Sequence, residues 1–210
     1  SIRLGYINHN PFAHIKRRTL PPRKIVWTET DIATYLTTAY GVFKWRNIGL
    51  IVQMSYEWCQ RQGDMRLLKW DQYDLETGVL TLDQSKRGVK VVLPTSPSLQ
   101  VMLTKQHEDF GFQQWIAPRP RPVESLYQPY TMRGFSVQAR NVREASGISS
   151  TLQVRDMRRT GTTELVEAGV DLPQIMAVTG HANPASVKPY MVNTLKSSTV
   201  ALKARWDSKT

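Results

Sequence analysis

One stretch of this sequence, residues 78–94, has the pattern of a β-hairpin, and it limits the folds that the chain can adopt. Residues 79–82 and 90–93 are rich in strand-forming side chains, and residues 85–88 between them supply a turn. The other ordered stretches carry apolar residues mainly at the three- and four-residue spacing of helices. We therefore expect a mainly α protein with one small antiparallel β-sheet, which is an α+β class.

Helix signals mark most of the chain from residue 28 onward. Thr28, with Asp31 three residues later, is a variant of the capping box, and it should begin a helix that reaches about Ala39. Gly169 is expected at the C-terminal cap of a later helix, and the proline-rich residues 119–129 are expected to form a loop. Apolar spacing predicts the other helices over residues 43–60, 63–70, 97–110, 133–146, 155–168, 172–178 and 195–206, with one more that carries Tyr190.

The balance of charge indicates a polyanionic partner. Lys and Arg number 28 against 17 Asp and Glu, so the formal net charge is +11 at pH 7. Such an excess favours nucleic acid, although a cytosolic protein that is basic without such a partner stays an alternative. The first 28 residues hold no acid, and we expect residues 1–27 to be a basic arm or interdomain linker, with cations at Arg3, Lys16, Arg17, Arg18, Arg23 and Lys24.

The sequence lacks the signals that several other classes of protein carry. The longest apolar run, around residues 48–54, is broken by polar residues and is too short to span a membrane. The first residues contain no signal-peptide apolar region, and Cys59 is the only cysteine, so we expect a reducing, cytosolic setting without internal disulfides. No Cys and His residues have the spacing of a metal site, and we expect neither a metal nor a cofactor.

The residue types that phosphoryl chemistry needs gather between residues 154 and 191. Arg155 and Arg158 are three residues apart, so on one helix they would project from the same face. Guanidinium forks of this kind can grip two oxygens of a phosphate at once. His181 can bind a phosphate oxygen or assist proton transfer, and Tyr190, nine residues later, can attack the phosphorus to form a phosphotyrosyl link.

These residues carry a resemblance to a known family. The motif "RDMRRT", the motif "VTGH" and the nine-residue interval from His181 to Tyr190 resemble the catalytic domain of the tyrosine recombinase (phage-type integrase) family. The spacing between the two motifs also agrees with that family. The sequence departs from the family pattern at one position, because Arg155 stands where the family usually has histidine.

The resemblance continues upstream and covers roughly residues 10–205. The segment "WCQRQGDMRLLKWDQYDLETG" is similar to a second family block, which matches Arg61 to the first catalytic arginine and Asp64 to an acidic positioning residue. The turn "QSKRG" matches Lys86 to the catalytic lysine of the family. Together these positions imply the tyrosine recombinase catalytic-domain fold.

The resemblance implies an enzyme that breaks and rejoins DNA strands. In this family the tyrosine attacks the scissile phosphate and forms a 3′-phosphotyrosyl intermediate, and the lysine protonates the departing 5′-hydroxyl. An arginine at position 155 is too basic to accept a proton at pH 7, so it would donate hydrogen bonds and charge to the transition state or position a phosphate elsewhere. What deprotonates the tyrosine stays open. The catalytic residues implied are Arg61, Lys86, Arg155, Arg158, His181 and Tyr190.

Ordinary structural roles are alternatives for each of these side chains. Arg61 could be a surface arginine, and Lys86 could be a solvated turn residue. Arg158 could instead form a salt bridge to a nearby acid, and His181 could cap a helix. Pro189, immediately before the tyrosine, restricts the preceding residue away from α geometry, which could place the tyrosine at a helix start or on a looser segment.

The family also implies partners and a setting. We expect double-stranded DNA at attachment sites, bound by a homo-tetramer, with DNA-bending accessory proteins as a further class of partner. The helix over residues 195–206 would dock on a neighbouring protomer or pack on its own core. Integration of a phage or prophage in the cytoplasm of a bacterial host, at the nucleoid, is the favoured role. The residues expected to contact the DNA backbone are Arg87, Lys90, Arg133 and Arg140.

Residues 28–210 are expected to form the catalytic domain. The family normally has a core-binding domain before it, and the first 27 residues are too few for one, so we expect the chain to be a fragment. Two other functions stay open. A type IB topoisomerase would use the same tyrosine chemistry on one duplex, and a non-catalytic DNA-binding protein would have the same charge without a reason to keep all six positions.

Overall fold

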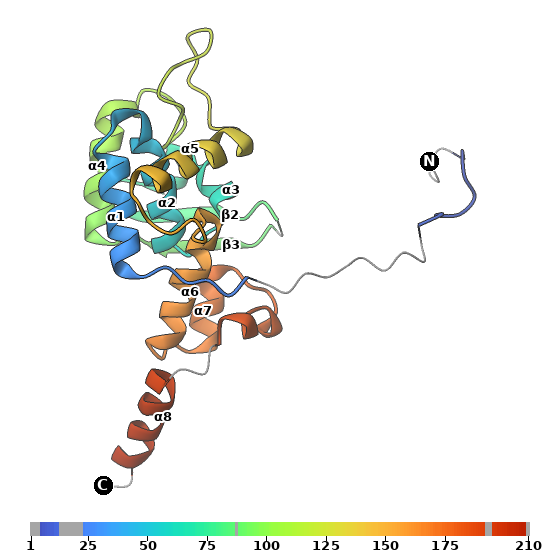
Figure 1. Ribbon diagram of the computed structural model, residues 1–210, viewed down its shortest axis with the longest axis vertical. Helices are drawn as coiled ribbons and strands as arrows, with labels where there is room; N and C mark the ends of the chain where they lie inside the picture. The colour runs from blue at the N-terminus through green and yellow to red at the C-terminus, as the bar shows by residue number, and fades with distance from the viewer. Residues whose placement is uncertain (1–4, 13–22, 87, 192–194, 209–210) are drawn as a thin grey trace.

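The computed structural model describes residues 5–12, 23–86, 88–191 and 195–208. Helices make up most of this part of the chain, and a small sheet lies beside them (Figure 1), which confirms the expected fold class. The α-helices are α1 (Glu29–Tyr40), α2 (Phe43–Glu57), α3 (Gln62–Met65), α4 (Pro97–Phe110), α5 (Met132–Ala145), α6 (Met157–Glu167), α7 (Leu172–Thr179) and α8 (Leu195–Asp207). The 3₁₀ turns are η2 (Trp70–Gln72), η3 (Val154–Asp156), η4 (Pro184–Ser186) and η5 (Lys188–Tyr190).

The core of the fold is built around α2. Residues 47–55 of this helix are all buried, because α1, α5 and α6 pack against it. The hydroxyl of Tyr35 in α1 donates a hydrogen bond to the carbonyl of Ala139 in α5 at 3.1 Å, which ties two of these helices together. The C-terminal end of the buried helix is thereby fixed, and the site described below begins there.

The sheet has three antiparallel strands in the order β1 (Tyr73–Asp74), β2 (Val79–Asp83) and β3 (Lys90–Pro94). The hairpin of β2 and β3 follows the predicted strands, and its register pairs Leu80 with Leu93 and Leu82 with Val91. These four side chains are buried. This is expected because alternate residues of a strand point to the same face of the sheet, and here that face packs on the core. The short strand β1 was not predicted, because two residues carry too little of that period.

The predicted helix boundaries are confirmed where a local signal sets them. The Thr28 side chain accepts from the backbone N–H of Asp31, and the Asp31 carboxylate accepts from the N–H of Thr28, so the capping box is complete. Gly169 follows the last residues of α6 with φ +77°, which is a left-handed conformation that glycine adopts without strain.

Three helix predictions are wrong. The helix expected over residues 63–70 is reduced to the single turn α3, because Leu68 and Trp70 exchange backbone hydrogen bonds with residues 114 and 116 instead of within a helix. Arg155 does not share an α-helix with Arg158, since it lies in the 3₁₀ turn η3, which ends where α6 begins. Tyr190 lies in the 3₁₀ turn η5 and not in an α-helix, since Pro184 and Pro189 interrupt this segment.

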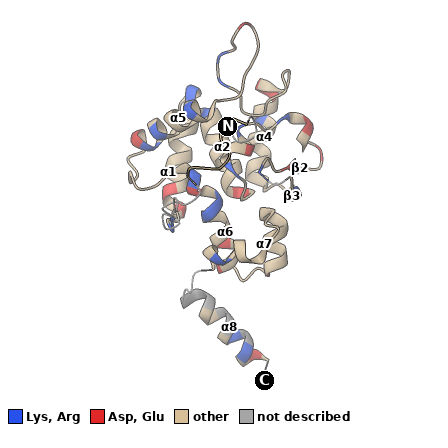
Figure 2. Ribbon diagram, turned by 90° about the vertical axis from the view of Figure 1, so that its right-hand side faces the viewer, with Lys and Arg blue, Asp and Glu red and all other residues tan. Residues whose placement is uncertain are grey.

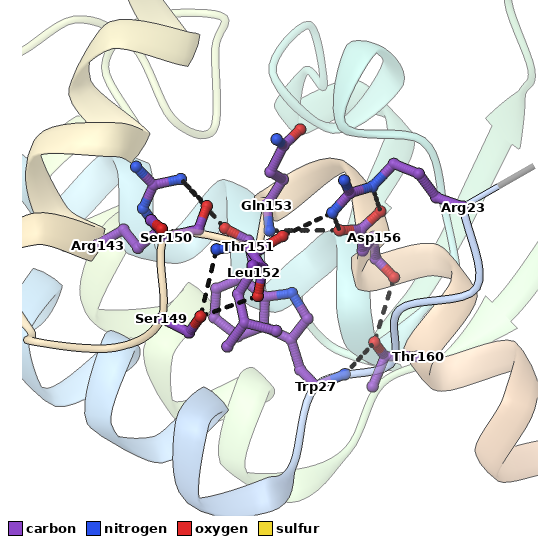
Figure 3. Close-up of polar contacts among 10 residues, drawn as sticks. All are labelled: Arg23, Trp27, Arg143, Ser149, Ser150, Thr151, Leu152, Gln153, Asp156 and Thr160. Carbon is purple, nitrogen blue, oxygen red and sulfur yellow. Dashed lines mark hydrogen bonds and ion pairs between the residues drawn. The ribbon is translucent and has the colours of Figure 1, made fainter. Parts of the chain in front are cut away.

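The segment that precedes α1 is docked on η3 and α6 (Figure 3). Nε and Nη2 of Arg23 donate to the two carboxylate oxygens of Asp156 at 3.1 and 2.8 Å, and Nη2 also donates to the carbonyl of Thr151 at 2.7 Å. The backbone N–H of Trp27 donates to Oγ1 of Thr160 in α6 at 3.1 Å. Residues 23–27, at the end of the predicted arm, therefore contact η3 and α6, the helix that carries Arg158.

Candidate active site

A cavity of about 300 Å³ lies where the C-terminal end of α2 meets α3, the hairpin and the junction of η3 and α6. Three guanidinium groups from separate elements line it, those of Arg61, Arg155 and Arg158. The cavity therefore gathers cations that are almost a hundred residues apart in the sequence. Its other lining residues are Ser55, Gln60, Gln62, Gly63, Asp64, Ser85, Met132 and Val154.

Arg158 is the most buried of these arginines, at 8% exposure. Its Nη2 donates to the carbonyl of Thr179 at 2.7 Å, whereas Nη1 is buried and has no hydrogen-bond partner among the described residues. Burial lowers the pKa of Arg158, as does the nearby charge of Arg61, while the charge of Tyr190 and a hydrogen bond that the Tyr190 oxygen accepts from Arg158 raise the pKa. A buried donor without a partner is uncommon, so Nη1 marks Arg158 as a candidate contact for an anionic ligand.

His181 follows α7, and its hydrogen bonds define which nitrogen carries the proton. Nε2 lies 3.2 Å from Nη2 of Arg158, which can only donate, so Nε2 accepts. Nδ1 lies 2.7 Å from Oγ1 of Thr179, and that hydroxyl donates its own proton to the carbonyl of Ile175 at 2.7 Å. A neutral imidazole protonated on Nδ1 satisfies all these contacts, and it directs its lone pair toward Arg158.

Tyr190 lies at the same edge of the site. Its ring centroid is 5.6 Å from that of His181, and the two rings are inclined by 44°. The guanidinium of Arg159 lies over the ring of Tyr190, 4.8 Å from the centroid, and its Nη1 donates to the carbonyl of Pro189 at 2.9 Å. Arg159 thus holds the short turn η5 and places a cation over the phenol ring.

Arg61 is positioned by a buried polar network at the base of the hairpin. Its Nη1 donates to Oε1 of Gln84 at 3.0 Å and lies 3.9 Å from Oδ2 of Asp64. Nε2 of Gln84 in turn donates to Gln60 and to the carbonyl of Thr179. That carbonyl also accepts from Arg158, so one backbone oxygen links the supports of two arginines.

The pattern that defines the phage integrase family matches residues 35–196. The chain belongs to the phage integrase family. This membership confirms the resemblance to tyrosine recombinases on which the six site positions were first aligned.

Two curated relatives agree with this assignment. The integrase of Enterobacteria phage 434 is 29% identical over 154 residues, which are 69% of this chain and 40% of that protein. A shufflon-specific DNA recombinase of Escherichia coli is 26% identical over 151 residues, which are 70% of this chain and 36% of that protein. The chain spans less than half of the length of these relatives.

Solved integrase and recombinase structures have the same fold. A XerA recombinase superposes with a TM-score of 0.68 at 15% identity, over 89% of this chain and 66% of the other. A lambda integrase dimer bound to a COC′ core site also gives 0.68, at 22% identity, over 91% of this chain and 55% of the other. These similarities confirm the tyrosine recombinase catalytic-domain fold.

The structure brings five of the six predicted catalytic residues together, and Lys86 is not among the residues that line the cavity. Lys86 is exposed beyond the end of β2, whereas its neighbour Ser85 lines the cavity. Asp64 contacts Arg61, and one of its oxygens accepts from the backbone N–H of Ser85. This carboxylate is therefore placed to hold the hairpin close to the arginines.

The residues predicted to contact the DNA backbone lie on two elements. Lys90 is exposed at the start of β3, and Arg133 and Arg140 are exposed along α5, where Figure 2 shows basic segments. Arg87 lies outside the described residues. Backbone contact by these side chains stays a prediction.

Sequence reasoning missed two residues of the site, Gln84 and Arg159. Both lie within the two motifs, Gln84 as the first residue of "QSKRG" and Arg159 as the third arginine of "RDMRRT". The signal was present, but only the fold shows that Gln84 joins Arg61 to α7 and that Arg159 covers Tyr190.

Two further observations concern ligands and membranes. No group of three or more His, Cys, Asp and Glu side chains in the described ranges is arranged to hold a metal ion. Within the same ranges, no helix has both the length and the apolar character needed to cross a bilayer.

Proposed function

We propose that this chain is the catalytic part of a site-specific DNA recombinase that cleaves and rejoins DNA through a 3′-phosphotyrosyl intermediate, in the integration and excision of a phage or prophage. One observation carries the proposal. Arg61, Arg155 and Arg158 line one cavity, Nη1 of Arg158 is buried without a partner among the described residues, and Tyr190 and His181 lie against that same Arg158. A phosphate bound to these arginines would be within reach of a nucleophile and a proton acceptor.

The arginines bind the scissile phosphate in this proposal. Arg158 donates to one non-bridging oxygen, while Arg61 and Arg155, which line the same cavity, donate to the same phosphate. The negative charge on those oxygens increases in the five-coordinate transition state, so fixed cations stabilise that state more than the ground state. The network through Gln84 keeps Arg61 in place before DNA binds.

Tyr190 is the nucleophile. Its phenol oxygen forms a bond to phosphorus as the bond from phosphorus to the 5′-oxygen breaks, which leaves the DNA joined to the protein through its 3′ end. The cation of Arg158 favours the phenolate as it forms. We assign the phenol proton to Nε2 of His181, the ring nitrogen that carries no proton, which gives up its hydrogen bond from Arg158 in this step.

Lys86 protonates the departing 5′-oxygen. Lys86 is exposed beyond β2, so the hairpin has to close over the bound phosphate for this step. The phosphotyrosyl bond retains the energy of the broken phosphodiester, and a 5′-hydroxyl from the partner duplex reverses the reaction. The cycle therefore runs without ATP.

The partner is double-stranded DNA at attachment sites, with Lys90, Arg133 and Arg140 on the backbone. Assembly as a homo-tetramer is part of the proposal, since lambda integrase has been solved as a tetramer bound to a Holliday junction. α8 exposes Leu202 and Trp206, which suits a helix that docks on a neighbouring protomer. A core-binding domain outside this chain, DNA-bending accessory proteins and a bacterial cytoplasmic location stay predictions.

Strand exchange is separated from the alternatives by a two-substrate assay. The chain is incubated with two duplexes carrying paired attachment sites and, separately, with one supercoiled plasmid carrying a single site. We expect recombinant joints from the duplex pair. Relaxation of the plasmid without joints would favour topoisomerase activity, and DNA binding without either product would favour a non-catalytic protein. The Tyr190→Phe variant should form no joints, and Tyr6→Phe, which removes the hydroxyl of an exposed tyrosine, should form them normally.

A further inference from the structure

A second cavity, of about 270 Å³, lies next to the first and shares one wall with it. Gln62, Val154 and Arg155 line both cavities, so Arg155 stands between them. The rest of the second cavity is formed by α5 and by the segment before η3, and none of the described residues that line it is acidic. These other lining residues are Ser136, Ala139, Arg140, Arg143, Leu152 and Gln153.

Three cations converge on this second cavity. Arg140 and Arg143 are three residues apart on α5 and so lie on one face of the helix. Nη1 of Arg143 donates to the carbonyls of Ser150 and Leu152, each at 3.2 Å (Figure 3), which fixes this guanidinium before any ligand binds. No hydrogen bond or ion pair joins the guanidinium of Arg140 or Arg155 to another residue in the described part of the chain.

The wall that the two cavities share indicates which ligand the second cavity binds. Successive phosphates of one DNA strand lie close together, with one charge per roughly 3.4 Å of axis per strand, so two adjoining cavities that share an arginine suit two phosphates of one strand. We propose that the second cavity binds a backbone phosphate that neighbours the scissile one on the cleaved strand, and that Arg155 bridges the two phosphates. The inference rests on the proposed function, because it takes the first cavity as the site of the scissile phosphate.

The proposal accounts for the arginine at position 155. A guanidinium carries five N–H donors in a planar fork and keeps its charge, so it can donate to two phosphates from one position. A histidine side chain is shorter than that of arginine, and its ring has only two nitrogens with which to bind phosphates. Arg155 thus positions the strand and stabilises charge, while proton transfer is left to His181.

A single-site charge deletion in the DNA tests the second site. Duplexes are prepared with one neutral methylphosphonate at each phosphate that flanks the scissile one, and the rate of covalent adduct formation is measured for wild type and for Arg140→Ala. For wild type, we expect the rate to fall about tenfold at one flanking position, as for loss of one charge-assisted hydrogen bond. For Arg140→Ala, which is already slowed on unmodified DNA, the same methylphosphonate should change the rate less than about twofold.

Two further variants sharpen the result. Arg121→Ala removes an exposed arginine that lines neither cavity, and it should keep the full wild-type sensitivity at the same position. Arg155→His should cleave unmodified DNA more slowly than wild type and should lose the sensitivity at that flanking phosphate. Equal sensitivity of wild type and Arg140→Ala at every position would overturn the second site while leaving the proposed function intact. Absence of any adduct on unmodified DNA would overturn the proposed function and this site with it.

Discussion

Nη2 of Arg158 lies 3.2 Å from Nε2 of His181. Because a guanidinium can only donate, this contact makes the histidine an acceptor on the side that faces the arginine. The same Nη2 also donates to the carbonyl of Thr179, whose hydroxyl accepts from Nδ1 of the imidazole. One short segment after α7 therefore sets both the direction of the arginine and the proton position of the histidine.

Removal of the His181 ring should act on the chemical step. We expect His181→Ala to bind DNA nearly as wild type does but to form the covalent adduct about 10² to 10⁴ times more slowly, as for loss of a proton-transfer group. Single-turnover adduct formation and DNA binding are measured separately. His9→Ala, at an exposed histidine, is the matched control and should react at the wild-type rate. A His181→Ala variant with an unchanged rate would remove this residue from the mechanism.

Gly180 should tolerate no side chain. It has φ +67°, and a Cβ there would come within 2.5 to 2.7 Å of the amide atoms of Gln84, which supports Arg61. Gly147 is a matched position, because its φ is +69° and a Cβ would meet nothing within 4 Å. We expect Gly147→Ala to cost about 1 kcal/mol of unfolding free energy and Gly180→Ala to cost more and to slow DNA cleavage. Denaturant unfolding tests this, and equal costs for the two variants would contradict it.

The docked segment before α1 should contribute to stability through Arg23. Asp156, whose carboxylate Arg23 binds through two nitrogens, is 4% exposed. We expect Arg23→Ala to lower the free energy of unfolding by about 1 to 3 kcal/mol, since it leaves a buried carboxylate without its cation. Lys24→Ala, at the exposed neighbouring position, should change it by less than about 0.5 kcal/mol. Identical midpoints for both variants in urea would show that the ion pair adds nothing.

The pH dependence of stability should include Glu164. Burial raises the pKa of this carboxyl, and the charges of Glu29 and Glu167 raise it further, against a lowering by the hydrogen bond from Tyr56. A carboxyl whose pKa is raised in the folded state contributes to the free energy of unfolding at pH values below its unfolded pKa, about 4.3. That contribution is lost as the pH rises through the folded-state pKa.

Glu164→Gln should abolish the loss of stability with rising pH, because glutamine does not ionise. Its side-chain oxygen can still accept the hydrogen bond from Tyr56. Relative to wild type, this variant should gain stability between about pH 4 and neutral pH. Glu108→Gln, at an exposed position, is the control. A difference between Glu164→Gln and wild type that stays constant over this pH range would count against the raised pKa.

The sequence predicted the parts of the fold that local patterns encode. The hairpin and the capping box at Thr28 are local, because strand alternation and a three-residue spacing need no knowledge of distant residues. The helix expected over residues 63–70 failed for the opposite reason. Its backbone groups bond to residues 114–116, which no local pattern reveals.

The residues of the candidate site also divide into those that sequence motifs identify and those that only the fold reveals. Motif spacing identified Arg61, Arg155 and Arg158, and the fold places their side chains around one cavity. The role of Gln84 depends on contacts to segments up to 95 residues away, so only the tertiary structure reveals it. The short turn at Tyr190 reflects two prolines that override the helical spacing of their neighbours.

The central claim is that Tyr190 becomes covalently joined to DNA, and a trapped adduct tests it most directly. The chain is incubated with a nicked suicide duplex of its attachment site, resolved on a denaturing gel, and digested for mass spectrometry. We predict an adduct from wild type and from Tyr6→Phe, with the DNA joined by its 3′ end to the peptide that contains Tyr190, and none from Tyr190→Phe. An adduct that persists in Tyr190→Phe, or that maps to another residue, would contradict the account.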